Sequence, residues 1–139
     1  MVDFVKTGEE LPAAVIKFLS GWQTIQEGNI SRGRKLAIEY NPERLPRCRQ
    51  EFRGAIFGEI EVYIRFHPGG QYYTGGVIEK ILASEQGFVI GLQTGRYEVT
   101  VPMDAAQIEL WFRGFYQTTS FYEEWDSQHG HNYWFQVVG

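Results

Sequence analysis

The sequence predicts an all-β fold, an antiparallel β-sandwich of about seven or eight strands. Three observations predict it: apolar and polar residues alternate with a period of two, the alternating segments are short, and Gly or Pro stands at most of the breaks. A closed barrel stays open as the alternative, because strand number and periodicity do not distinguish it from two packed sheets. We expect one domain over residues 1–139, because this length suits a single hydrophobic core.

The N-terminal segment, residues 1–30, permits two interpretations. Thr7 and Glu10, followed by Pro12, have the spacing of a capping box and open a short helix in the first interpretation. In the second, a strand begins near Ile16 and places every second residue up to Trp22 on one face. We favour the strand.

The clearer strands begin at residue 35. The segment Glu59 to His67 alternates four apolar side chains with four polar or aromatic ones, which no helix does. In residues 71–82 the pair Gly75-Gly76 predicts a bulge or bend. The other predicted strands are residues 35–40, 87–93, 97–101, 107–113 and 132–138.

The charge of the chain argues against nucleic acid as a partner. The formal net charge is −4, whereas binding to phosphates depends on a surplus of Lys and Arg. One basic cluster exists, but Pro46 and neighbouring acidic residues interrupt it, so we interpret it as a solvated turn. The cluster consists of Arg44, Arg47, Arg49 and Arg53.

The single cysteine and the hydropathy indicate where the protein resides. Cys48 has no partner for an intramolecular disulfide, and we expect it to be structural or incidental rather than a nucleophile. The N-terminus lacks the pattern of a leader, and no stretch approaches the ~18 apolar residues of a membrane span. We therefore expect a cytoplasmic protein with no membrane partner.

No group of residues has the pattern of a catalytic or metal site. Asp126 and His129, with a serine between them, lie too close together on one loop to form a nucleophile, base and orienter. Glu123 and Glu124 are adjacent, so in an extended segment they point to opposite faces. His131 adds a third candidate metal ligand to Asp126 and His129, but polar turns commonly carry such residues. We expect no enzyme, no cofactor and no metal.

The C-terminal segment is similar to a known family. The run from Trp125 to Tyr133, preceded by residues 108–112, resembles the end of carbohydrate-binding module family 21, the starch- and glycogen-binding domains. The matching positions are Trp125, Asp126, Gly130, Asn132 and Tyr133. The resemblance implies an immunoglobulin-like sandwich that binds α-glucan without cleaving it.

The resemblance also implies roles for single residues. Trp125 matches the position whose ring stacks on glucose, and Asn132 matches an amide that bonds to sugar hydroxyls. Asp126, Gly130 and Tyr133 match positions that act as the scaffold of the loop. We expect Trp125 to lie in this polar loop, because no alternating apolar partner stands beside it.

The chain departs from that family at two places and resembles a second family. Ser127 stands where the family usually has Asn, and Tyr72 or Tyr73 stands where it has a Trp after the central strand. Residues 41–48 and 65–70 are similar to a bacterial domain family of unknown function that shares the same ending. We therefore expect a bacterial source.

The residues themselves also favour a ligand with an apolar face and a polar rim. Aromatic residues make up 16% of the chain, more than packing alone needs. A sugar offers a C–H face to rings and hydroxyls to amides and carboxylates. Strand alternation points Tyr63, Trp111 and Trp134 away from the predicted core, where a ligand, the N-terminal segment, a loop or a second copy covers them.

Two hypotheses follow for the function. The first is a non-catalytic domain that binds a polysaccharide or oligosaccharide of the starch or glycogen type. The candidate ligand-binding residues are Trp125, Asn132, Trp111, Tyr72, Tyr73 and Tyr122. The second is a protein-interaction domain, a homodimer among its forms, because exposed aromatic residues also anchor protein interfaces.

Overall fold

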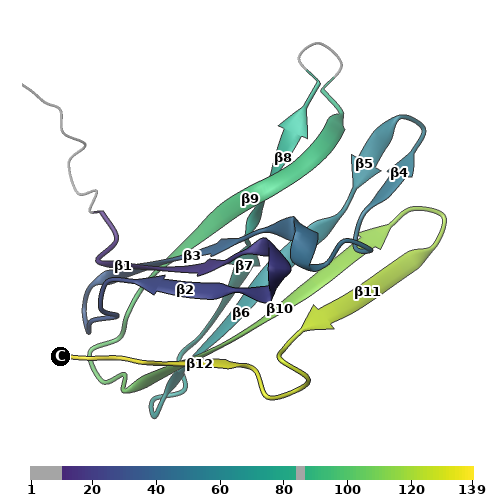
Figure 1. The fold of residues 1–139 in the computed structure, drawn as a ribbon. Coiled ribbons are helices and arrows are strands. Elements are labelled where there is room, and N and C mark those ends of the chain that lie inside the picture. Colours follow the sequence, from purple (N-terminus) through teal and green to yellow (C-terminus); the bar gives the residue numbers. More distant parts are fainter. Residues whose placement is uncertain (1–10, 84–86) are drawn as a thin grey trace, which may run out of the picture.

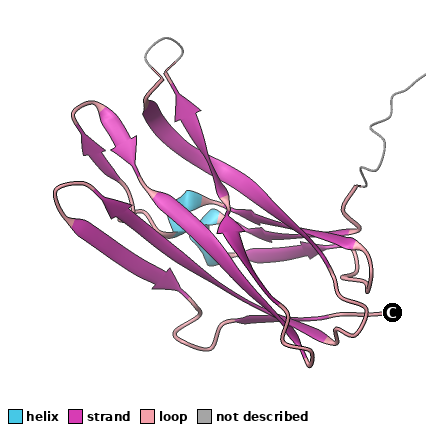
Figure 2. Ribbon diagram, turned by 180° about the vertical axis from the view of Figure 1, so that it is seen from behind, coloured by secondary structure: helices cyan, strands magenta, loops and turns pink. Residues whose placement is uncertain are grey.

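The computed structural model describes residues 11–83 and 87–139, which form β-strands arranged in two layers (Figures 1 and 2). The first sheet comprises β1 (Ala14–Phe18), β2 (Thr24–Glu27), β3 (Lys35–Tyr40), β8 (Ile78–Leu82) and β9 (Val89–Thr100), in the order β2-β1-β3-β9-β8. The second comprises β6 (Glu59–His67), β7 (Tyr72–Gly76), β10 (Gln107–Gln117), β11 (Phe121–Asp126) and β12 (Tyr133–Gln136). Its order is β11-β10-β6-β7, and β12 also pairs with β10.

Shorter elements complete the described part of the chain. The strands β4 (Gln50–Phe52) and β5 (Ala55–Phe57) form a separate hairpin. Two 3-10 turns, η1 (Ser20–Trp22) and η2 (Pro42–Arg44), follow β1 and β3. None of the helical elements in residues 11–83 and 87–139 is long and apolar enough to cross a membrane.

The predicted sandwich is confirmed, with two differences. The described residues contain twelve strands instead of about seven or eight, because several are short and lack a clear alternation. One pairing, between β1 and β3, is parallel, whereas the other paired strands of both sheets are antiparallel. No ladder in the described part of the chain joins the two sheets, so the barrel is not formed.

Alternation along the strands builds the core. The inward side chains of the second sheet are Ile60, Val62, Ile64 and Phe66 of β6 and Ile108, Leu110 and Phe112 of β10. Those of the first sheet are Ile16, Phe18, Leu36, Ile38 and Tyr40. The sheets meet through rings, since Phe112 lies 4.6 Å from Phe18 and 4.2 Å from Tyr40 between centroids. Burial of these apolar groups is the main stabilising term of the fold.

The N-terminal strand is confirmed, but it ends earlier than predicted. Thr7 and Glu10 lie outside the described residues, and residues 14–18 are β1 rather than a helix. After Leu19 the chain turns back, with φ of 78° at Gly21 and 68° at Trp22. Because β2 then runs antiparallel to β1, Trp22 does not share the buried face of Ile16.

Residues 71–82 form two strands in different sheets, where one bent strand was predicted. The strand β7 pairs with β6, and β8 pairs with β9. Val77, fully buried, marks the crossing between the layers. The segments 87–93 and 97–101, predicted as two strands, belong to the single long strand β9.

The strand β11 was not predicted, and Trp125 was placed in a polar loop. That placement is wrong, because Trp125 lies on β11 opposite Arg113 of β10. The segment 121–126 lacks a clear apolar alternation, so its pairing with β10 decides its conformation.

Gly95 provides a test of the crossing between the sheets. A Cβ at Gly95 would lie 2.7 Å from Ile78 Cα and 2.8 Å from the Val77 carbonyl oxygen, both backbone atoms. We expect Gly95→Ala to lower the free energy of unfolding by about 2 to 3 kcal/mol, measured by urea denaturation. Gly76→Ala is the matched control, because no atom lies within 4 Å of its Cβ. Equal stability of the two variants would contradict the packing described here.

Candidate ligand-binding site

The outward faces of the two sheets differ in chemistry. The first sheet carries ion pairs, such as Lys17 with Glu27 at 3.2 Å and Arg96 with Glu39 at 2.5 Å. The second sheet carries aromatic rings on its outward face, between the charged residues of β6, β10 and β11. A solvent-facing sheet surface is normally polar, so the second face is the one that needs a functional explanation.

Four rings form a continuous row on this face, which we call the aromatic row: Tyr72, Trp111, Tyr63 and Trp125. Ladder register places Tyr63 opposite Trp111, and the two rings stack with centroids 5.7 Å apart and planes 8° apart. Trp125 lies 5.8 Å from Tyr63, and Tyr72 lies 6.4 Å from Trp111. The end members are half-exposed, 50% for Trp125 and 48% for Tyr72.

Beside the row lies a group that we call the polar cluster: His67, Glu109 and Asn132. The Glu109 carboxylate accepts a hydrogen bond from Asn132 Nδ2 at 2.7 Å and lies 2.8 Å from His67 Nε2. Burial raises the pKa of Glu109, but the bonds from Asn132 and His67 outweigh this effect and lower it overall. Trp134 stacks on the His67 ring at 5.1 Å. The face therefore presents amide, imidazole and carboxylate groups next to rings.

The structure brings together four of the six predicted ligand-binding residues. Trp111, Trp125 and Tyr72 belong to the aromatic row, and Asn132 belongs to the polar cluster. All four lie on or beside the outward face of the second sheet.

The other two predicted residues, Tyr73 and Tyr122, do not join this face. Tyr73 lies 6.0 Å from Phe66 of the core, and Tyr122 stacks on Tyr116 and packs against the core. The reason is the period of two, because Tyr73 follows Tyr72 directly and therefore points to the opposite side of the strand.

His67 and Glu109 were not predicted as ligand-binding residues. Alternation along 107–113 places Glu109 on the side of Trp111, which is a signal that the sequence holds. The contact with His67 depends on the register between β6 and β10, where Gln107 lies opposite His67. That register is a tertiary property.

A cleft of about 970 Å³ opens beside this face, between η1 and β2 and the turn that joins β11 to β12; we call it the side cleft. Its lining consists of Trp22, Thr24, Glu124, Trp125, Asp126, Ser127, Gln128, His129, Tyr133, Trp134 and Phe135. Three of the four Trp residues of the chain are among them.

Below the side cleft lies a buried ion pair. The Asp126 carboxylate accepts hydrogen bonds from Arg44 Nε at 3.0 Å, Tyr40 Oη at 2.6 Å and Tyr133 Oη at 2.5 Å. Both side chains of the pair are about 1% exposed. Asp126 and Tyr133 thus tie the two ends of the turn between β11 and β12 to the buried Arg44.

Arg44 was interpreted as part of a solvated turn. That interpretation is wrong, because the Arg44 side chain is buried. Besides Asp126, its guanidinium donates to the carbonyl oxygens of Leu19 and Gln23, at 3.0 and 3.1 Å, and to Tyr133 Oη at 2.9 Å. Burial of the charge is tolerated because its donors find acceptors. Sequence reasoning missed this because the acceptors are distant in the chain.

The loop between β11 and β12 does not form a metal site in the described structure. The Asp126 oxygens are occupied by Arg44 and two tyrosines, so they are not offered to a metal together with His129 and His131. Within residues 11–83 and 87–139, no group of three or more His, Cys, Asp or Glu side chains is placed to hold a metal ion. Gly130, with φ of 91°, forms the turn of this loop.

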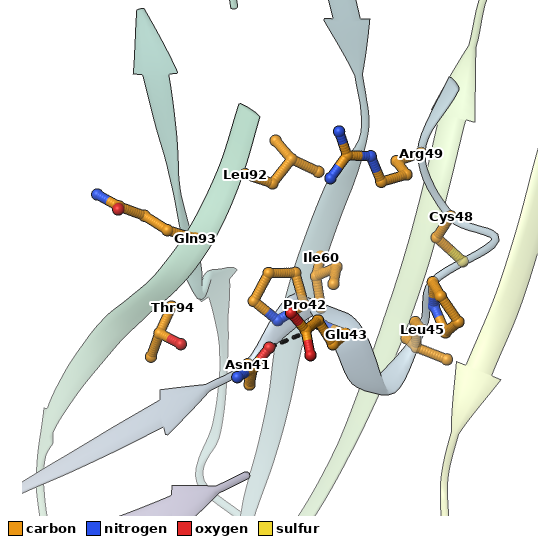
Figure 3. Close-up of a pocket in the computed structure, with 11 residues that line it drawn as sticks. Asn41, Pro42, Glu43, Leu45, Cys48, Arg49, Ile60, Leu92, Gln93 and Thr94 are labelled. Carbon is orange, nitrogen blue, oxygen red and sulfur yellow. Dashed lines mark hydrogen bonds between the residues drawn. The ribbon is translucent and has the colours of Figure 1, made fainter. Parts of the chain in front are cut away.

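A second, smaller cavity of about 300 Å³ lies between β9 and the segment around η2 (Figure 3). Leu92 and Gln93 line it from β9, and Arg49 and Cys48 line it from the other side. Burial raises the pKa of Cys48 to about 11, so the thiol stays protonated near neutral pH. This favours the interpretation of Cys48 as a structural residue.

Removing one member of the ion pair tests its role. We expect Asp126→Ala to lower the free energy of unfolding by about 3 to 5 kcal/mol, because Arg44 would stay buried without its counter-charge. The double variant Arg44→Met with Asp126→Leu should be less destabilised than Asp126→Ala, measured by urea denaturation. If Asp126→Ala were as stable as the wild type, the stabilising role of the buried ion pair would be contradicted.

The two tyrosines of this network predict a loss of stability in alkali. Burial and the bond to Asp126 raise the pKa of Tyr133 to about 12, and burial and the same carboxylate raise that of Tyr40. The unfolded chain then loses these protons first, so stability falls as the pH rises above about 10. We expect the thermal midpoint of Tyr133→Phe to fall less steeply between about pH 10 and 12 than that of the wild type. An unchanged slope would contradict this assignment.

Comparison with known proteins gives a family but no activity. A comparison with curated proteins found no match, and a comparison with solved structures found none either. No match to carbohydrate-binding module family 21 was found among the family models, so sugar binding is left as a proposal. One family model, that of a family of unknown function, matches residues 8–138. Since the match covers nearly the whole chain, the protein belongs to the family of unknown function DUF6209.

Proposed function

We propose that the protein is a non-catalytic carbohydrate-binding domain that holds a glucan of the starch or glycogen type on the outward face of the second sheet. The observation that supports this most is the aromatic row with the polar cluster beside it. In the part of the chain that the structure describes, ion pairs lie on the outward faces of both sheets, whereas the continuous row of rings lies on the outward face of the second sheet.

The chemistry of the face suits a sugar. Trp125 and Tyr72, the half-exposed ends of the row, offer ring surface to the C–H face of a pyranose. Asn132, His67 and Glu109 offer donors and acceptors for hydroxyl groups. Their mutual hydrogen bonds hold these side chains in place, which lowers the entropy lost on binding.

We propose binding without hydrolysis because the carboxylates of this face are engaged by neighbouring donors. Glu109 accepts from Asn132, Glu61 accepts from Tyr63 Oη at 2.7 Å, and Glu123 pairs with Arg113. Glycosidic cleavage uses one carboxylic acid and one free carboxylate across the scissile bond. Binding needs neither.

One observation favours a second candidate, a protein-interaction surface. Tyr63 and Trp111 turn their faces toward each other, so part of the ring surface is used within the row. Exposed Trp and Tyr side chains are also the usual anchors of protein interfaces. Under this candidate, a partner protein or a second copy of the chain covers Trp125 and Tyr72.

Affinity electrophoresis tests the sugar proposal. In native gels cast with soluble starch or glycogen, we expect the wild type to migrate more slowly than in a gel without polysaccharide. Trp125→Ala and Tyr72→Ala should each weaken retention about tenfold or more, because each removes a stacking surface. Tyr73→Ala is the matched control, since its ring lies on the opposite side of the same strand and should leave retention unchanged.

Two measurements accompany the gels. The thermal midpoints of Trp125→Ala and Tyr72→Ala should stay close to that of the wild type, because both rings are half-exposed. Unchanged migration of the wild type in every gel would contradict the sugar proposal. In that case a dimer in light scattering, lost in Trp125→Ala, would support the interaction surface.

A further inference from the structure

Resting on the proposed function, we infer that the side cleft is a second sugar subsite continuous with the aromatic row, so that the ligand is an extended glucan chain rather than a short oligosaccharide. The side cleft and the row share Trp125, and Trp134 joins the side cleft to the polar cluster.

Ladder register explains this continuity. Trp125 lies opposite Arg113, and Trp134 lies opposite Glu109, so both belong to the outward face of β10. Both β11 and β12 pair with β10, and the turn between them forms a wall of the side cleft. A chain lying on the face at Trp125 therefore continues into the side cleft along the ring that both parts share.

The lining of the side cleft has the composition that a sugar requires. Trp22 and Trp134 provide ring surface, and they are 62% and 45% exposed. Polar side chains stand between the rings: Thr24, Glu124, Ser127, Gln128 and His129. Its volume of about 970 Å³ is at the upper end of the usual range for ligand sites.

The backbone at Trp22 is the second observation that points to a ligand. Its φ of 68° lies in the left-handed region, which is unfavourable for a bulky residue and typical of glycine. Burial of the ring does not compensate for this unfavourable backbone conformation, because the ring is mostly exposed. Its contact is with the Arg44 guanidinium, which lies 4.7 Å from the ring centroid. A strained, exposed Trp at the mouth of a cleft indicates a role for the ring in binding.

The placement of the two parts on different elements decides the class of ligand. Tyr72 lies on β7, at the edge of the second sheet opposite β11, whereas Trp22 lies in η1, between β1 and β2 of the first sheet. A short oligosaccharide occupies one of the two places. A longer chain contacts both, and linked contacts strengthen binding through the effective concentration of the second contact.

The variant Trp22→Gly tests the role of the Trp22 ring without adding strain to the backbone. Glycine adopts the left-handed conformation without strain, so this variant removes the ring and relaxes the backbone together. Isothermal titration with maltotriose and maltoheptaose supplies the probes. We expect the wild type to bind maltoheptaose at least about tenfold more tightly than maltotriose, and Trp22→Gly to bind both with the affinity that the wild type has for maltotriose.

Two further variants make the result specific. Trp22→Phe keeps a ring at the same place and should restore most of the preference for the longer chain. Trp125→Ala should weaken binding of both sugars, because its ring belongs to both parts of the surface. The thermal midpoint of Trp22→Gly is measured in parallel to show that the variant is folded under the conditions of the titration, because the ring also covers the Arg44 guanidinium.

The outcomes distinguish this inference from the proposed function. If both sugars bind but the preference of Trp22→Gly equals that of the wild type, the second subsite is wrong and the aromatic row stands. If the wild type binds maltotriose and maltoheptaose with equal affinity, the second subsite is likewise wrong and the aromatic row stands. If neither sugar binds to the wild type, and starch and glycogen also fail to retain it, the proposed function is wrong and the subsite with it.

Discussion

The buried ion pair between Arg44 and Asp126 is the constraint on which the candidate surface depends. It joins η2 to the end of β11, and its hydrogen bonds extend to β3 through Tyr40 and to β12 through Tyr133. Arg44 also holds the turn after β1 through the Leu19 and Gln23 carbonyls. A buried charge of this kind is costly unless its partners are in place, so it favours one arrangement of these segments over others.

This arrangement is what gives the surface its shape. The ring of Trp22 lies over the guanidinium, and Trp125 directly precedes the buried carboxylate, so both walls of the side cleft are held by the same pair of charges. On the other side, the aromatic row is held mainly by ladder register, because adjacent strands bring every second side chain into contact. The two parts of the surface therefore have different physical supports, one electrostatic and one from the sheet, and they meet at Trp125.

Several features were predictable from local patterns. Alternation identified β3, β6 and β10 and the direction of their side chains, and this was sufficient to place Trp111 outward. The end of the strand at residue 40 was also predicted, and directly after it the Asn41 side chain accepts a hydrogen bond from the backbone of Glu43. The strand β11 was not predictable because its residues lack a clear apolar alternation and its conformation depends on pairing with β10. The crossing at Val77 and the burial of Arg44 were not predictable because they depend on segments far apart in the chain.

The sequence by itself determined the all-β class, the inward and outward sides of the long strands and the residue types available for binding, because these follow from a period of two and from composition. Only the tertiary structure decided which outward rings meet, that His67 lies beside Glu109, and that a basic residue in a turn becomes the centre of a buried network. The physical reason is that ladder register and the solvation of a charge depend on neighbours in space, which alternation along one strand does not specify.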